Sequence, residues 1–87
     1  MLSKIEFIRE YFPELLVMDG FDDCIIGICT RFGQPEIVAY DLNKVIEKLM
    51  ADGMTEGQAY EYYEYNQLGA GMGELTPCFI DTLERED

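Results

Sequence analysis

The sequence predicts a single small α+β domain with the element order α-β-β-α-α-β. Three observations predict it: apolar residues at helical spacing near both the N-terminus and the middle of the chain, two adjacent β-branched stretches, and a short apolar run near the C-terminus. With 87 residues the chain can build one hydrophobic core, so we expect residues 1–87 to form one domain. The charged end, residues 83–87, is expected to be frayed.

The first helix is expected to begin after Ser3, because Ser3 and Glu6 have the spacing of a capping box. Pro13 should end this helix near Tyr11, since proline cannot continue the helical hydrogen bonds. Asp19-Gly20 then indicates a turn. Apolar residues recur at helical spacing before the proline, with two more widening the stripe: Met1, Ile5, Ile8 and Phe12, then Leu2 and Phe7.

Two strands are expected next. The stretch "CIIGICTRF" (24–32) is β-branched and apolar, and a turn at 33–35 separates it from "EIVAY" (36–40), which predicts an antiparallel hairpin. Both faces would be largely apolar, so the sheet is either covered on both sides or has one face free for contact. Simple alternation assigns the residues of the first strand to two faces: Ile26, Ile28 and Thr30 on one, Ile25, Gly27 and Cys29 on the other.

Two helices joined by a tight connection should follow the hairpin. Asp41 is a suitable N-cap, and Asp52-Gly53 should end the second helix. Thr55 and Gln58 form a second capping box, which starts the third helix at once. The run "CFI" (78–80) then predicts a short third strand. The apolar stripe of the second helix has the spacing i, i+3, i+4, i+7, i+8: Leu42, Val45, Ile46, Leu49 and Met50.

The strongest bulk signal is charge. Eighteen acidic residues face six basic ones, for a net charge of -12, and there is no basic residue between Lys48 and Arg85. Such a chain should repel nucleic acid, anionic lipid and nucleotides, because phosphate binding depends on Lys and Arg. We therefore predict no direct contact with nucleic acid or membrane, and a protein partner with a basic surface. The alternative is that the acidic residues serve solubility alone.

The third helix contains "AYEYYEYN" (59–66), with four of the six tyrosines. Helical geometry groups Tyr62 and Tyr63 with Ala59 and Asn66, which predicts that these two tyrosines are in the core. Tyr60 and Tyr65 should fall on the two flanks of the helix, at the boundary between core and water. Beside carboxylates, they suit recognition of Arg and Lys, since aromatic rings attract cations. The same side of the helix could instead serve a homodimer. The predicted partner-binding residues are Glu56, Tyr60, Glu61, Glu64 and Tyr65.

The sequence lacks the residues that several kinds of catalysis and metal binding require. The chain has no histidine, and its three cysteines have no CxxC spacing, so we predict no catalytic residue, no cofactor and no metal site. An odd number of cysteines without this spacing predicts thiols that are reduced, buried and inert, as in a cytoplasmic protein. No apolar run approaches the length of a membrane span. The acidic turn "DGFDD" (Asp19, Asp22, Asp23) lacks the spacing of a calcium loop and is expected to be solvated.

The glycine-rich segment "NQLGAGMGELTP" (66–77) does not have the pattern of a phosphate-binding loop. A helix precedes it and a strand follows it, which is the reverse of the dinucleotide fingerprint, and no Lys is present. We predict instead that Gly69 takes the left-handed cap of the third helix and that a turn leads Thr76-Pro77 into the last strand.

The stretch from Val38 to Ile80 combines the motifs "YD", "DGMT", "EYYEYN" and "GAGMGELTP". With these motifs, residues 38–80 resemble a family of short acidic proteins encoded by tailed bacteriophages and prophages. Gly71 departs from the family, whose members have an aromatic residue there, and Gln58 replaces an acidic one. The resemblance implies a phage origin, a bacterial host cell and a related fold. The matching positions are Tyr40, Asp41, Asp52, Gly53, Met54, Thr55, Glu61, Tyr62, Glu64, Tyr65, Asn66, Gly69, Ala70, Gly73, Glu74, Thr76 and Pro77.

Charge, the missing chemistry and the resemblance lead to one functional hypothesis. We expect a non-enzymatic phage accessory protein that binds a host protein, as an anti-defence inhibitor of the anti-CRISPR kind. It would act as a DNA mimic, presenting its acidic surface to a basic, nucleic-acid-binding site. The alternative is a structural or assembly accessory protein that works as a homo-oligomer through an uncovered sheet face.

Overall fold

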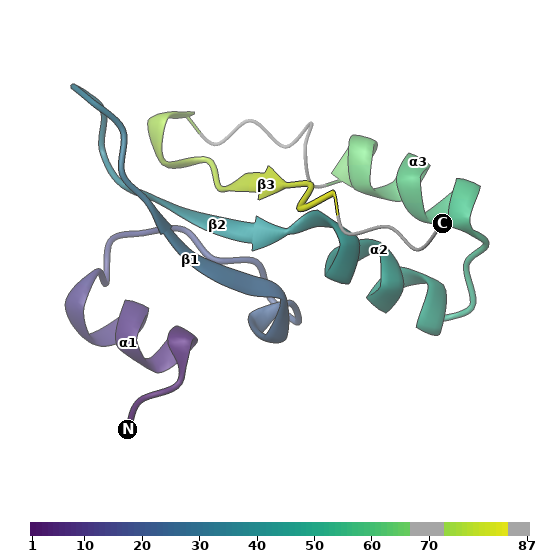
Figure 1. The fold of residues 1–87 in the computed structure, drawn as a ribbon, viewed down its shortest axis with the longest axis horizontal. Helices are drawn as coiled ribbons and strands as arrows, with labels where there is room; N and C mark the ends of the chain where they lie inside the picture. The colour runs from purple at the N-terminus through teal and green to yellow at the C-terminus, as the bar shows by residue number, and fades with distance from the viewer. Residues whose placement is uncertain (67–72, 84–87) are drawn as a thin grey trace.

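The computed structural model describes residues 1–66 and 73–83 (Figure 1). It confirms the predicted α+β fold, with three helices and a three-stranded sheet in the expected order. Gly69 and Gly71 lie outside the described residues, as does most of the tail that was expected to be frayed. The elements are α1 (Lys4–Tyr11), β1 (Ile25–Cys29), β2 (Ile37–Asp41), α2 (Leu42–Ala51), α3 (Glu56–Asn66) and β3 (Cys78–Ile80).

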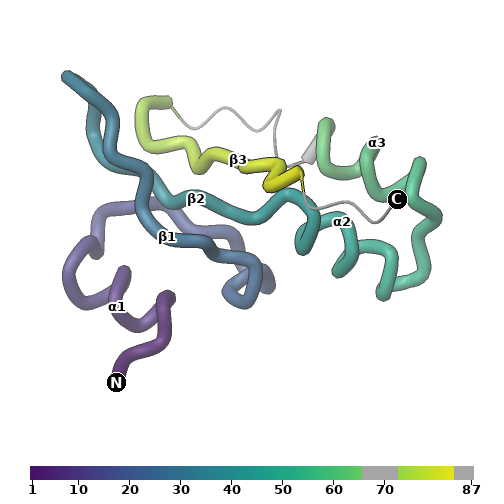
Figure 2. Tube along the Cα trace, viewed as in Figure 1, coloured from purple at the N-terminus to yellow at the C-terminus, as the bar shows by residue number. Residues whose placement is uncertain are grey.

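The strand β2 is the centre of the sheet, with the order β1-β2-β3 (Figure 2). It pairs with β1 in antiparallel fashion, as the hairpin predicts, and with β3 in parallel fashion. Two parallel strands need a long connection between them, and here that connection contains α2 and α3. The helices α2 and α3 therefore lie together beyond one end of the sheet, away from α1, which packs beside β1.

A β-bulge at Ile26 overturns the predicted faces of β1. Ile25 pairs with Tyr40 and Gly27 with Ala39, so Ile26 is an extra residue without a counterpart on β2. The bulge interrupts the alternation, and Ile28 joins Ile25 on the core face. The prediction that Ile26 and Ile28 share a face is wrong for this reason, and Ile26 remains partly exposed.

The predicted helix boundaries of α1 are confirmed. The Ser3 hydroxyl accepts a hydrogen bond from the Glu6 amide at 3.3 Å, and the Glu6 carboxylate accepts one from the Ser3 amide at 3.0 Å. The bond from the Ser3 amide, with a smaller contribution from the Ser3 side chain, also lowers the pKa of the Glu6 carboxyl group. The helix ends at Tyr11, two residues before Pro13. The buried side of α1 is narrower than the predicted stripe, because Ile8 is buried while Phe7 is substantially exposed.

The ends of α2 also match the sequence. The Asp41 carboxylate accepts a hydrogen bond from the Lys44 amide at 3.2 Å. At the other end the Gly53 amide donates to the Met50 carbonyl and the Met54 amide to the Leu49 carbonyl, which is a Schellman motif. Gly53 has a φ of 106°, a left-handed conformation that glycine adopts without strain.

The core lies between the sheet and the helices, and its centre is Tyr40. Its ring stacks against Phe79 of β3 at 5.8 Å between centroids, and Phe79 and Tyr63 of α3 form a T-shaped pair at 5.0 Å between centroids. The Tyr40 hydroxyl accepts a hydrogen bond from the Met18 amide at 2.6 Å, which fixes the loop after α1 to the sheet. Three aromatic rings thus connect β2, β3 and α3.

Both faces of β2 are buried, because Ile37 and Ala39 are buried on the face opposite Val38 and Tyr40. Of the two predicted arrangements, the centre of the sheet therefore has the one in which both faces are covered.

The 3₁₀ turn Gly73–Leu75 precedes β3, and the Thr76 side chain and amide both donate to the Gly73 carbonyl. The predicted turn into the last strand is therefore present.

The thiols differ from one another in burial. Cys24 is buried as expected, whereas Cys29 and Cys78 are half-buried, because they lie on the outer strands rather than on β2. Burial raises the pKa of Cys24 to about 11. Burial also raises the pKa of Cys78, and the neighbouring Cys29 adds to this effect. Cys24 and Cys78 are therefore protonated at neutral pH.

Candidate protein-binding surface

The helix α3 carries all five residues predicted to bind a partner. It begins at Glu56 because Thr55 and Gln58 form the predicted capping box: the Thr55 amide donates to the Gln58 side chain at 2.9 Å, and the Gln58 amide donates to the Thr55 hydroxyl at 3.2 Å. The connection from α2 is only a few residues long, which keeps the two helices adjacent.

The buried side of α3 is small. Among its described side chains, those of Ala59 and Tyr63 are buried, and Tyr63 packs on Phe79. Burial raises the pKa of Tyr63, and the neighbouring Glu64 charge adds to the rise, so this hydroxyl stays neutral at neutral pH. The prediction for Tyr63 is confirmed. The side chain of Asn66, predicted on the same side, is outside the described residues.

The prediction that Tyr62 is a core residue is wrong, because 41% of Tyr62 is exposed. Ala59 and Tyr63 define the buried direction, and Tyr62 lies about 80° from it at 100° per residue. Tyr60 lies about 80° away on the other flank and is half-buried against the core, as predicted. The prediction that Tyr65 lies at the boundary between core and water is wrong, because Tyr65 is 83% exposed, on the outer side of the helix.

Glu56 and Tyr60 face a groove between α2 and α3. This groove has a volume of about 300 Å³, and Glu47 and Met50 of α2 form its other wall together with Asn43 and Ile46. A carboxylate on each side and an aromatic ring give the groove an acidic, partly apolar lining. Its contributors from α2 were not among the predicted site residues.

The outer face of α3 has a different composition. Glu61 and Tyr65 line a shallow hollow of about 400 Å³, together with Met54, Gln58 and Tyr62. Glu64 is exposed one turn from Glu61 and Tyr60. We define the outer face as the exposed side chains of Gln58, Glu61, Tyr62, Glu64 and Tyr65.

The structure thus divides the five predicted residues into two sets. Glu56 and Tyr65 are nine residues apart, so they lie about 180° apart around the helix axis. A flat partner surface cannot contact both. Glu61, Glu64 and Tyr65 lie on the outer face, where one partner can reach all three, whereas Glu56 and Tyr60 belong to the groove.

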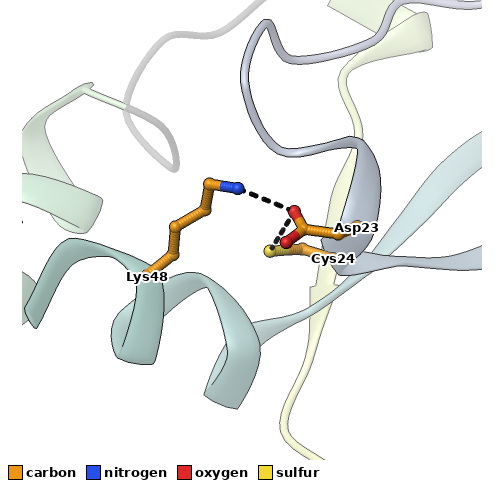
Figure 3. A network of polar contacts seen from close by, with 3 residues as sticks. All are labelled: Asp23, Cys24 and Lys48. Carbon is orange, nitrogen blue, oxygen red and sulfur yellow. Dashed lines mark hydrogen bonds and ion pairs between the residues drawn. The ribbon is translucent and has the colours of Figure 1, made fainter. Parts of the chain in front are cut away.

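In the acidic turn before β1, the last of the three carboxylates has a partner within the chain. The Lys48 ammonium of α2 contacts the Asp23 carboxylate at 2.9 Å, and the Cys24 thiol donates to the same carboxylate at 3.7 Å (Figure 3). The hydrogen bond from Lys48 lowers the pKa of Asp23. Within residues 1–66 and 73–83, no group of three or more His, Cys, Asp or Glu side chains is placed to hold a metal ion.

Three residues of the outer hollow escaped prediction: Met54, Gln58 and Tyr62. Tyr62 could have been found from its angle alone, since it is as far from the buried direction as Tyr60. Met54 and Gln58 carried no comparable signal, because their positions depend on how the connection between α2 and α3 folds.

Two further findings concern the whole chain. In the described part of the structure, no helix has the length and apolar character needed to cross a bilayer. A comparison with protein-family models, curated proteins and solved structures finds no match to the chain.

Proposed function

We propose that the chain is a non-enzymatic binding protein whose outer α3 face docks on a basic surface of another protein. The observation that carries the proposal is the composition of this face: two exposed carboxylates, Glu61 and Glu64, beside a tyrosine that is 83% exposed. The rings attract Arg and Lys side chains and the carboxylates pair with them. Interfaces of this kind are enriched in tyrosine on one side and arginine on the other.

The charge of the chain supports the same partner. With a net charge of -12 and no basic residue between Lys48 and Arg85, the chain is attracted to basic proteins over long distances and repelled by phosphate groups. The basic surfaces that best match such a field are those that bind nucleic acid. Together with the resemblance of residues 38–80 to phage proteins, this leads to the narrower proposal of a DNA-mimicking inhibitor of the anti-CRISPR kind, made by a phage and acting in the cytoplasm of its bacterial host.

The decisive experiment reverses the charge of the outer face and leaves the fold intact. The double variant Glu61→Lys/Glu64→Lys, used as bait in a bacterial lysate, should lose the basic protein that the wild-type chain captures. The matched control is Glu14→Lys/Asp19→Lys, which makes the same change in net charge at two exposed positions before β1. Equal capture by the wild-type chain and the outer-face variant would refute the docking surface.

Two added measurements test the narrower proposal. Capture should weaken when the salt concentration is raised from about 0.1 M to about 0.5 M, because exposed charge pairs are screened. Excess duplex DNA should compete with the chain for the captured protein. Capture that withstands excess DNA would leave the docking surface in place but exclude a nucleic-acid-binding site as its target.

A further inference from the structure

The helix α1, which lies far from α3 (Figure 1), carries a second exposed apolar surface. Phe7 is 46% exposed and Tyr11 is 59% exposed, and their rings are 4.6 Å apart between centroids. Leu2, which precedes the N-cap Ser3, is also exposed. These side chains follow one another along the side of α1 that does not enter the core. Exposed apolar surface of this extent on a small protein indicates a contact site.

A groove continues this surface onto the sheet. It lies between α1 and β1, has a volume of about 320 Å³ and is lined mainly by apolar atoms. Gly27 forms part of its floor. We define the α1 face as Leu2, Lys4, Phe7, Glu10 and Tyr11 with this groove.

The charge of the α1 face differs from that of the rest of the chain. Residues 1–12 contain Lys4 and Arg9 against Glu6 and Glu10, so their side-chain charges cancel, while the whole chain has a net charge of -12. Two copies of the chain repel one another through most of their surfaces. They can approach one another with the least repulsion through α1. A basic protein, by contrast, gains no net attraction there.

The charges on α1 are also arranged for self-recognition. Lys4 and Glu10 are exposed and lie three residues before and after Phe7, about 60° to either side of it around the helix. A two-fold axis through the contact near Phe7 can therefore bring Lys4 of each copy opposite Glu10 of the other. Lys4 already donates to the Ile25 carbonyl at 3.3 Å, but an ammonium group has two further hydrogens to donate.

We propose that the α1 face joins two copies of this chain in a symmetric dimer. The phenyl and phenol rings of Phe7 and Tyr11 form its apolar centre, and two reciprocal Lys4–Glu10 pairs flank them. Symmetric interfaces require this kind of self-complementary patch. The proposal is independent of the outer face of α3, which stays free on both copies.

The first test compares two aromatic residues with the same substitution. Sedimentation equilibrium of the full chain, from about 1 µM to about 1 mM, covers the affinity range of a small interface. The wild-type chain should show a monomer–dimer equilibrium, and Phe7→Glu should weaken it at least about tenfold. Phe32→Glu, at a fully exposed phenylalanine of the β1–β2 turn, should leave it unchanged. A wild-type chain that stays monomeric throughout, or an equal effect of both variants, would overturn the proposal.

The second test exchanges the flanking charges. Lys4→Glu and Glu10→Lys should each weaken the dimer, because each places like charges together, and the double variant should restore it with the original net charge. A double variant as weak as the single ones would exclude the reciprocal pairs. If Phe7→Glu does not fold, Tyr11→Glu replaces it: Tyr11 is 59% exposed, so the monomer tolerates a carboxylate there, and the charge should weaken the dimer. The dimer should resist added salt, unlike capture of a basic partner.

Discussion

The helices α2 and α3 are neighbours of nearly equal length, with 10 and 11 residues, yet the core holds them in different ways. On α2 three aliphatic side chains are buried in one stripe: Val45, Ile46 and Leu49. On the described part of α3 the buried side chains are Ala59 and Tyr63. The composition of α2 is thus explained by the core it packs against.

The composition of α3 is not explained in this way. Its remaining tyrosines and glutamates are exposed or half-exposed, although aromatic residues are costly to leave in water. A helix that packs through two residues and exposes aromatic rings resembles one side of an interface more than a structural element. The comparison predicts that substitutions in α3 separate sharply into those that affect folding and those that affect binding.

The largest expected effect separates Tyr63 from Tyr65. Tyr63→Ala removes the contact with Phe79 and should lower the free energy of unfolding by about 3–5 kcal/mol, or leave the chain unfolded. Tyr65→Ala, two residues along, should change it by less than about 0.5 kcal/mol while weakening capture of a basic partner. Urea unfolding followed by circular dichroism measures both. Similar losses from the two variants would contradict the division of α3.

Much of this fold was predictable because its local signals are strong. Ser3, Asp41 and Thr55 each start a helix through the hydrogen bonds that their side chains form within one turn. These caps involve residues three positions apart, so no knowledge of the tertiary structure is needed. The end of α2 at Gly53 was predictable for the same reason.

The wrong or missing predictions concern features that depend on contacts between residues far apart in the sequence. The bulge at Ile26 depends on pairing with β2, and a period of two along the strand cannot show it. The central position of β2 depends on β3, which joins it from 39 residues further along the chain, since Ala39 pairs with Cys78. The candidate site was placed on the correct helix, but helical angles alone did not show that α2 takes Tyr60 and Glu56 into a groove.

An intermediate effect is expected at Tyr40, the residue that connects β2 to Phe79 of β3 and to the loop after α1. Tyr40→Phe keeps the ring stack with Phe79 but leaves the Met18 amide without its acceptor, which should cost about 1–3 kcal/mol. The same substitution should alter the response to alkali. Burial raises the pKa of Tyr40 above its ordinary value. There is therefore a range of alkaline pH in which the Tyr40 hydroxyl is still neutral in the native state but already ionised in the unfolded chain.

The sign of this pH effect follows from the raised pKa. The contribution of Tyr40 to stability is complete below about pH 10, the pKa of a tyrosine in the unfolded chain, and is lost as the pH rises through the higher native pKa. Cys24, with a pKa of about 11 instead of 9.0, acts in the same direction. Urea unfolding at a series of pH values between about 8 and 11 should therefore show a shallower decline for Tyr40→Phe than for the wild-type chain. Parallel declines would show that the Tyr40 hydroxyl does not contribute.

The smallest effects come from the two glycines on either side of the connection between α2 and α3. Gly53 has a φ of 106°, so Gly53→Ala forces a side chain into a left-handed conformation and should lower the free energy of unfolding by about 1 kcal/mol. Gly57 lies in the first turn of α3 with ordinary helical geometry and open space around its Cα. Gly57→Ala should raise the free energy of unfolding by up to about 1 kcal/mol, because alanine favours the helix. Opposite signs from the same substitution would show that the end of α2 is fixed by backbone geometry and the start of α3 by helix propensity. If both variants lost stability, Gly57 would have to serve a close contact, and the start of α3 would be as constrained as the end of α2.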